Sequence, residues 1–223
     1  MTVILVVLTM VVFLVIDYLR HGRKAETPAT QSAREVVVSP TVQPVYVSGF
    51  ELRENLRYHA GHTWALQESP TLVRVGVDAF ASRLVGKAES IVLPKLGQWV
   101  RQGQKIVTVL RDGSRAEMVS PIEGEVTKVN DRVLTDPSLP WRDPYGEGWL
   151  FAAFSPDAAT NFRNLLGASL ARRWMEEAAS RLRAMLPAPA GAVAQDGGVA
   201  VADLTAHLPN QEWSKLAREF FLT

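Results

Sequence analysis

The chain has 223 residues, of which 47% are hydrophobic and 21% are charged, and its formal net charge is +1. This length and composition allow one well-packed core with extensions, and the near-neutral charge gives no electrostatic basis for binding nucleic acid. The sequence contains no cysteine, which excludes disulfides, thiol catalysis, iron–sulfur clusters and zinc–thiolate sites.

A long apolar run opens the chain at residues 1–19. A membrane-spanning helix needs about 20 such residues, so we predict a transmembrane anchor there. A cleaved signal peptide is the alternative, but no basic residue precedes the run and residues 25–29 form a poor cleavage site. The basic residues nearest to the run, in 20–24, all follow it. The positive-inside rule therefore predicts a single-pass protein of the inner (cytoplasmic) membrane with its soluble domain in the cytoplasm.

Residues 20–50 are mostly polar and contain Thr, Ser, Gln and Pro, which predicts a linker between the anchor and a domain at 51–155. Early in that domain, His59 and His62 place two imidazoles three positions apart. No carboxylate or thiol nearby in the sequence completes the four ligands of a closed metal site, so we predict no metal site.

The predicted domain consists mainly of short strands and turns. Residues 73–77 alternate in the manner of a half-buried strand. Asp78 is then a suitable N-cap for a short helix at 79–84, and Gly86 is a suitable C-terminal cap. Residues 91–150 contain further short apolar strands separated by glycines and prolines, a pattern that favours a sandwich or a barrel.

An Asp-Gly pair, Asp112-Gly113, lies at the centre of 104–120 between two apolar strands. A two-residue type I′ turn requires positive φ at both central residues, and Asp-Gly is the strongest short-range signal for such a hairpin. Asp112, Ser114 and Arg115 would then be exposed around the tip, either as a recognition patch for a partner or as a solvated turn.

Two helical segments are predicted after the β domain. Residues 156–186 carry apolar residues at helical spacings, with a break expected at Gly167. The apolar stripe suits packing on the β domain or a partner, and the basic residues on the other faces also suit an anionic membrane surface. Residues 187–202 are a flexible Pro/Ala/Gly linker.

The last segment, 203–223, is a predicted docking helix that begins at Pro209. An isolated helix of this length is not stable, so it must dock either in a groove of a partner or back onto its own domain. Its apolar face is formed by Trp213, Leu216, Phe220 and Phe221.

Short motifs of glycine, proline, aromatic and apolar residues follow one another in a definite order between residues 62 and 150. In chain order they are His62-Thr63-Trp64, residues 73–77, Ala79-Phe80-Ala81, Leu84, Gly86, Leu93-Pro94, Gly97, Val100, Gly103, Ser120-Pro121-Ile122, Gly124, Val129-Asn130, Pro137, Leu139, Asp143-Pro144-Tyr145-Gly146 and Gly148-Trp149-Leu150.

This ordered series resembles the H protein of the glycine cleavage system, a lipoyl-carrying member of the biotinyl/lipoyl domain group, over roughly residues 56–170. The resemblance implies a mostly β, lipoyl-like barrel-sandwich. Here that domain is combined with an N-terminal transmembrane helix and a C-terminal α-helical extension.

One departure from the family concerns the site of the lipoyl group. In the family a lysine at the hairpin tip, in a Glu-x-x-Lys context, carries it. The corresponding residues here are Gly113 and, three positions earlier, Leu110, and no lysine occurs between Lys105 and Lys128. The resemblance therefore implies that the attachment site is lost, and no cofactor is predicted.

The leading functional hypothesis is a non-catalytic, membrane-anchored H-like protein that acts as a scaffold or accessory subunit of a membrane-associated complex, through protein partners of unknown identity. The first alternative is a lipoyl carrier of glycine cleavage or a related lipoate-dependent pathway, with lipoate on an unexpected lysine. The second is a membrane-fusion-type adaptor of an efflux or secretion system. An enzyme is not predicted, because no Ser/His/Asp set, paired-carboxylate pattern or phosphate-binding loop is recognisable.

Overall fold

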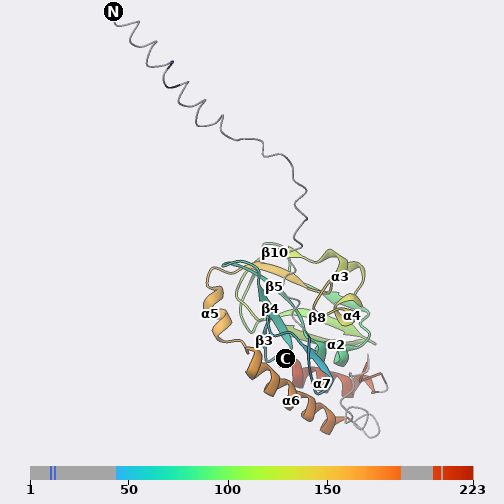
Figure 1. The fold of residues 1–223 in the computed structure, drawn as a ribbon. Coiled ribbons are helices and arrows are strands. Elements are labelled where there is room, and N and C mark those ends of the chain that lie inside the picture. The colour runs from blue at the N-terminus through green and yellow to red at the C-terminus, as the bar shows by residue number, and fades with distance from the viewer. Residues whose placement is uncertain (1–10, 12, 14–43, 187–202, 207, 223) are drawn as a thin grey trace, which may run out of the picture. The chain divides into compact units, whose positions relative to one another are not determined.

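Antiparallel β-sheets organise the protein in a computed structural model, which describes residues 11, 13, 44–186, 203–206 and 208–222 (Figure 1). The chain divides into two units, Met1–Thr41 and Val42–Thr223, of which the second contains the sheets. No helix within the described residues is both long and apolar enough to cross a bilayer. The predicted anchor at 1–19 lies outside the described residues except for Val11 and Phe13, which are helical and exposed.

The larger sheet has six strands in the order β3-β4-β5-β11-β10-β7, and each neighbouring pair is antiparallel. Strand β10 begins with the alternation of buried and exposed residues expected when one face packs on the core and the other faces water, whereas β4 and β11 each contain a run of three buried residues. The strands are β3 (Arg57–His59), β4 (Thr63–Gln67), β5 (Leu72–Val77), β7 (Trp99–Val100), β10 (Gly124–Val129) and β11 (Phe151–Phe154).

A three-stranded sheet in the order β6-β8-β9 contributes the second layer, from β6 (Ser90–Val92), β8 (Lys105–Arg111) and β9 (Ser114–Val119). The helices are α2 (Ala79–Val85), α3 (Asp131–Thr135), α4 (Leu139–Arg142), α5 (Ala158–Arg163), α6 (Ala168–Met185) and α7 (Asn210–Phe221). The predicted β fold with C-terminal helices is therefore confirmed for the described residues.

Several local predictions are also confirmed. Asp78 caps α2, since its Oδ1 accepts a hydrogen bond from the backbone N–H of Ala81 at 2.8 Å. Gly86 ends the same helix with a φ of 63°, a conformation that glycine adopts without penalty. Gly167 separates α5 from α6, and Pro209 directly precedes α7.

The β domain begins earlier than residue 51. Strand β1 (Val45–Val47) pairs with β2 (Phe50–Leu52) around a two-residue turn. Both turn residues have positive φ, 50° at Ser48 and 88° at Gly49. This hairpin replaces the last part of the predicted linker because Val47 and Phe50 are buried in the core. The rest of that linker, and all of the predicted linker at 187–202, lie outside the described residues.

One hydrophobic core includes buried residues of both sheets, and Trp64 is among its largest side chains. The indole of Trp64 is buried and donates to the backbone carbonyl of Pro144 at 3.1 Å. A side chain on Gly76 would lie 2.3 Å from a ring carbon of Trp64, so only glycine allows β5 to approach the indole. This contact explains the need for glycine at position 76 beside Trp64.

The long helix α6 and the terminal helix α7 lie along one side of the β domain (Figure 1). Helix α7 packs against β9, and an ion pair between Arg181 and Glu219 joins it to α6. The apolar side chains that the sequence places on one face of α7 are buried in this contact. They are Trp213, Leu216, Ala217, Phe220 and Phe221.

We predict that Trp213→Ala lowers the free energy of unfolding by about 3–5 kcal/mol, the usual cost of truncating a buried tryptophan. Trp213 is 1% exposed, and its indole N–H donates to the carbonyl of Leu84 at 2.9 Å, so the substitution also removes one of the two hydrogen bonds to that carbonyl, the other coming from the hydroxyl of Thr205. Urea denaturation followed by circular dichroism measures the change. Lys215→Ala, on the exposed face of the same helix, is the control and should change stability by no more than about 0.5 kcal/mol. Equal effects of the two substitutions would contradict the docking of α7.

Candidate functional site

The tip of the β8–β9 hairpin is the position that the sequence singles out, and its geometry follows the prediction. Arg111 pairs with Ser114 across a two-residue turn, and φ is 46° at Asp112 and 73° at Gly113. The predicted Asp-Gly turn with two positive φ values is thus confirmed. A Cβ on Gly113 would meet nothing within 4 Å, so the tip has room for a side chain although glycine provides none.

Arg111, the last residue of β8, is 6% exposed and connects three parts of the chain. Its Nη1 donates to the carbonyl of Val85 at the end of α2 (2.7 Å) and to the hydroxyl of Thr205 (2.5 Å). Its Nη2 donates to the carbonyl of Thr205 and lies 3.5 Å from a carboxylate oxygen of Asp203. The guanidinium also lies 5.6 Å from the ring centre of Trp213, within cation–π range.

The C-terminal segment therefore covers one side of the hairpin and reaches its tip. The side-chain amide of Asn210 donates to the carbonyl of Asp112 at 2.6 Å. The structure shows the fold-back alternative for the terminal helix. The four residues predicted as partner-binding, Trp213, Leu216, Phe220 and Phe221, are buried against the chain itself and are not accessible to a partner in this conformation.

The three residues predicted to form a recognition patch at the tip differ in their exposure. The side chain of Asp112 is 62% exposed, Ser114 is half-buried, and Arg115 is exposed. Arg115 reaches back along β9 to the carboxylate of Glu117 (2.6 Å), which also pairs with Lys105 (3.2 Å). Hydrogen bonds from Lys105 and then Arg115 hold the pKa of Glu117 below its usual value. A recognition patch at the tip stays a prediction.

The two lysines that flank the hairpin in sequence lie away from its tip. Lys105 is the first residue of β8, at the end opposite the turn, and is paired with Glu117. Lys128 lies on β10 of the larger sheet, where its ammonium sits 5.4 Å from the ring centre of Trp149. Neither amine is in the position of a tip residue.

His59 and His62 have structural contacts of different kinds. Nδ1 of the buried His62 lies 2.8 Å from Oδ2 of Asp78, and its ring stacks on Phe80 with centroids 4.1 Å apart. Nδ1 of His59 accepts the backbone N–H of Gly61 at 3.0 Å. Within the described part of the chain, no group of three or more histidine and acidic side chains could hold a metal ion.

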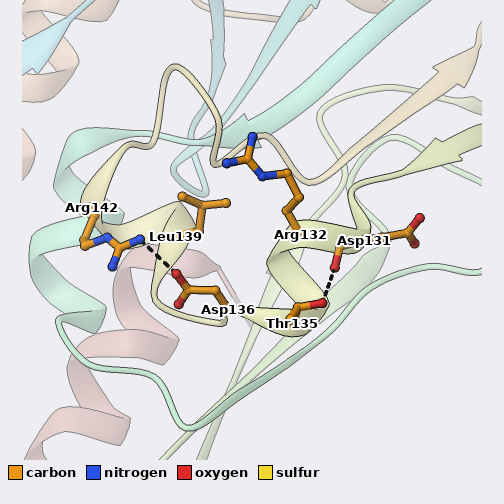
Figure 2. A pocket seen from close by; sticks show the side chains of 6 residues that line it. All are labelled: Asp131, Arg132, Thr135, Asp136, Leu139 and Arg142. Carbon is orange, nitrogen blue, oxygen red and sulfur yellow. Dashed lines mark hydrogen bonds and ion pairs between the residues drawn. The ribbon is translucent and has the colours of Figure 1, made fainter.

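A surface pocket of about 360 Å³ lies between α3 and α4 (Figure 2). Its two arginines already have carboxylate partners, because Arg142 pairs with Asp136 at 2.8 Å and Arg132 pairs with Glu147. The hydroxyl of Ser138, and then Arg142, hold the pKa of Asp136 below its usual value. These contacts stabilise the α3–α4 turn and give the pocket no distinct ligand chemistry.

Three residues that form the contacts at the β8–β9 hairpin were not predicted from the sequence: Arg111, Asp203 and Thr205. An arginine at a strand end beside a polar turn has the usual pattern of an exposed residue. The only local signal in the sequence was the apolar face of the terminal helix. It predicts that this face is covered, but it does not identify the surface that covers it.

In comparisons with known proteins, residues 56–178 of the chain match the family model described as "Glycine cleavage H-protein". A probable glycine cleavage system H protein of Aeropyrum pernix is 36% identical over 102 residues, which are 46% of this chain and 71% of that protein. The glycine cleavage system H protein of Anaeromyxobacter sp. (strain K) is 32% identical over 127 residues, 57% of this chain and 98% of that protein. A crystal structure of a glycine cleavage system H protein from Mycobacterium marinum aligns with a TM-score of 0.47 and 28% identity, covering 53% of this chain and 94% of that one.

We predict that Arg111→Met lowers the free energy of unfolding by about 3–5 kcal/mol, since it leaves the buried partners of the guanidinium without donors. The exposed Arg115 on the same hairpin provides the control, and Arg115→Met should cost no more than about 1 kcal/mol. Urea denaturation of both variants measures the difference. A cost at Arg111 equal to that at Arg115 would contradict the role of Arg111 in joining the three segments.

A second prediction concerns pH. Burial, and then the charge of nearby His62, lower the pKa of His59 from its ordinary value of 6.5. The fold therefore favours neutral His59, and its contribution to stability is complete above pH 6.5 and is lost as the pH falls from 6.5 through the folded-state pKa. His59→Asn retains an acceptor for the Gly61 N–H but does not titrate, so its stability should decline less between pH 7 and pH 5. Parallel slopes for wild type and variant in urea denaturation over this range would contradict the assignment.

Proposed function

The chain belongs to the glycine cleavage H-protein family, and from this premise we propose that it is a non-catalytic H-like module that has lost the lipoyl attachment site and serves as a scaffold or accessory subunit at a membrane. A lipoyl carrier presents its group on an amine at the exposed hairpin tip. The observation that carries the proposal is that this tip consists of Asp112 and Gly113, neither of which has an amine. The position three residues before Gly113 is Leu110 rather than a glutamate.

The surroundings of the tip support the same proposal. The turn itself is open, but the chain limits access to the hairpin from one side, because Asn210 contacts the backbone of Asp112 and α7 packs against β9. The segment that does this lies beyond residue 178, where the family match ends. The chain therefore adds its own C-terminal helix to the hairpin that the family uses for the lipoyl group.

The membrane component rests on the sequence of residues 1–19, which is apolar over a length that suits a single span. The basic residues that follow it favour an inner-membrane anchor with the domain in the cytoplasm. In a scaffold role, the anchor would hold the H-like domain beside protein partners in the same membrane-associated complex.

The alternative is a lipoyl carrier of glycine cleavage or a related pathway. The names of the relatives favour it, since those proteins are called glycine cleavage system H proteins. It requires lipoate on a lysine away from the tip, such as Lys105 or Lys128. A membrane-fusion-type adaptor shares the anchor and the lipoyl-like domain, but a two-residue hairpin tip leaves no room for the long helical insertion that those adaptors carry.

The intact mass of the protein purified from its own host membranes tests the proposal. We expect the unmodified mass, with protein partners co-purifying in stoichiometric amounts. An H protein of known lipoylation, expressed in the same cells, is the positive control. A mass increased by one lipoyl group would overturn the proposal and favour the carrier, and peptide mapping would then locate the modified lysine.

The double variant Leu110→Glu, Gly113→Lys tests whether the missing amine at the tip is what prevents attachment of a lipoyl group. It restores the Glu-x-x-Lys pattern at a tip where a side chain meets no steric obstacle, although lysine at a φ of 73° costs about 1–2 kcal/mol. We expect the variant to gain a lipoyl group where the wild type does not. If the wild type and the variant were modified to the same extent, the tip residue would not be the determinant.

A further inference from the structure

Trp99 is the most exposed of the six tryptophans, at 48%, and lies on the edge strand of the larger sheet. It pairs with Glu125 of β10, which in turn pairs with Phe154 of β11. Directly paired residues of neighbouring strands share a face, so these three side chains form one row on the outer face of the sheet. Phe154 is 44% exposed, and Leu96 in the turn before β7 is 70% exposed. The row therefore holds two exposed aromatic side chains, Trp99 and Phe154, on either side of the exposed Glu125.

A pocket of about 460 Å³ adjoins this row, with Trp99 as one of its walls. Its other walls are held in place by side-chain amides that connect the β7–β8 turn to α5. The amide nitrogen of Gln102 donates to the carbonyls of Pro121 (2.8 Å) and Asn161 (3.0 Å), and its oxygen accepts from Asn164 (2.8 Å). Since these amides already have partners, the pocket is preformed and its own polar groups do not need a ligand to satisfy them.

The charge of the pocket lining has one sign. Glu123 and Asp157 line it, both are exposed, and no lysine or arginine is among the lining residues, although the guanidinium of Arg163 donates to the hydroxyl of Thr160 in the lining at 3.1 Å. Neither carboxylate has an ion pair with another described residue. A tryptophan face beside two carboxylates attracts a cation, because the ring quadrupole and the carboxylate charges act in the same direction.

Another tryptophan beside the same sheet, Trp149, provides a comparison. The guanidinium of Arg74 and the ammonium of Lys128 lie 5.5 Å and 5.4 Å from its ring centre, so its cations come from within the chain. No cation of the described residues lies over the ring of Trp99 in this way. Trp99 therefore has the carboxylates and the open ring of a cation site, while the cation itself must come from another molecule.

We propose that Trp99, Glu123 and Asp157, with the apolar rim of Leu96 and Phe154, form a docking site for a partner protein that presents a lysine or arginine side chain between apolar residues. The cation enters the pocket beside the indole, and the apolar neighbours cover Leu96 and Phe154. This site lies on the larger sheet, and it is independent of whether the β8–β9 tip carries a lipoyl group.

The test uses the full chain labelled with ¹⁵N and the peptide acetyl-Leu-Arg-Leu-amide at millimolar concentrations. The indole N–H signal of Trp99 is identified by its loss in Trp99→Phe, and the signal of Trp149 is the internal reference. The matched probe acetyl-Leu-citrulline-Leu-amide has the same shape without the charge. We expect the arginine peptide to shift the Trp99 signal and not that of Trp149, with at least fivefold weaker binding of the citrulline peptide.

Charge-neutral variants complete the test. Glu123→Gln combined with Asp157→Asn should raise the Kd of the arginine peptide at least fivefold, whereas Glu176→Gln combined with Glu177→Gln, on the exposed side of α6, should leave it unchanged. Equal binding of the two peptides, no shift of the Trp99 signal, or an unchanged Kd in the Glu123/Asp157 variant would overturn the proposal. A Trp99 signal that moves with protein concentration alone would also overturn it, since a second copy of the chain would then be the occupant.

Discussion

The buried guanidinium of Arg111 joins the C-terminal segment of the chain to the β domain. A charge removed from water must have its hydrogen-bonding groups satisfied, or it costs several kcal/mol. The partners of Arg111 come from the end of α2 and from the segment at Asp203 and Thr205, so those two regions must meet at the end of β8. Once they meet there, Trp213 is placed beside the guanidinium, and α7 follows along β9.

This arrangement changes what the hairpin can do. The chain's own helix α7 packs against β9, and Asn210 contacts the backbone at the tip. A covalent arm at Gly113 would have to move beside this helix. The absence of an amine at the tip and the helix packed on β9 are two separate observations, one on the sequence and one on the packing, and both support the proposed non-lipoylated module.

The parts of the fold that the sequence predicts are those decided by local chemistry. The Asp112-Gly113 turn, the Asp78 cap and the Gly86 stop depend on the backbone preferences of the residues themselves. Ser48-Gly49 is a signal of the same kind, but it connects strands of only three residues at the end of a polar stretch. The composition of that stretch favoured a linker, and the burial of Phe50, which decides the matter, is a long-range contact.

The parts that could not be predicted depend on residues far apart in the chain. The hydroxyl that accepts a hydrogen bond from Arg111 belongs to Thr205, 94 positions away, and no periodicity in the sequence relates the two. The amphipathic pattern of α7 requires only that something covers its apolar face, so a partner and the chain's own hairpin satisfy it equally. Likewise, the alternation along a strand shows which residues share a face, but only the pairing of β7, β10 and β11 brings Trp99 and Phe154 into one row.

The hairpin and the outer face of the larger sheet differ in whether the chain itself supplies the groups that contact them. At the hairpin, a buried cation and an aromatic helix face come from within the molecule, and the contact is complete without a partner. At the outer face of the larger sheet, the indole of Trp99 and two carboxylates are in place, but the described residues supply no cation for them. The docking site proposed on the larger sheet therefore lies on a different surface from the hairpin, where the chain's own C-terminal helix makes the contacts.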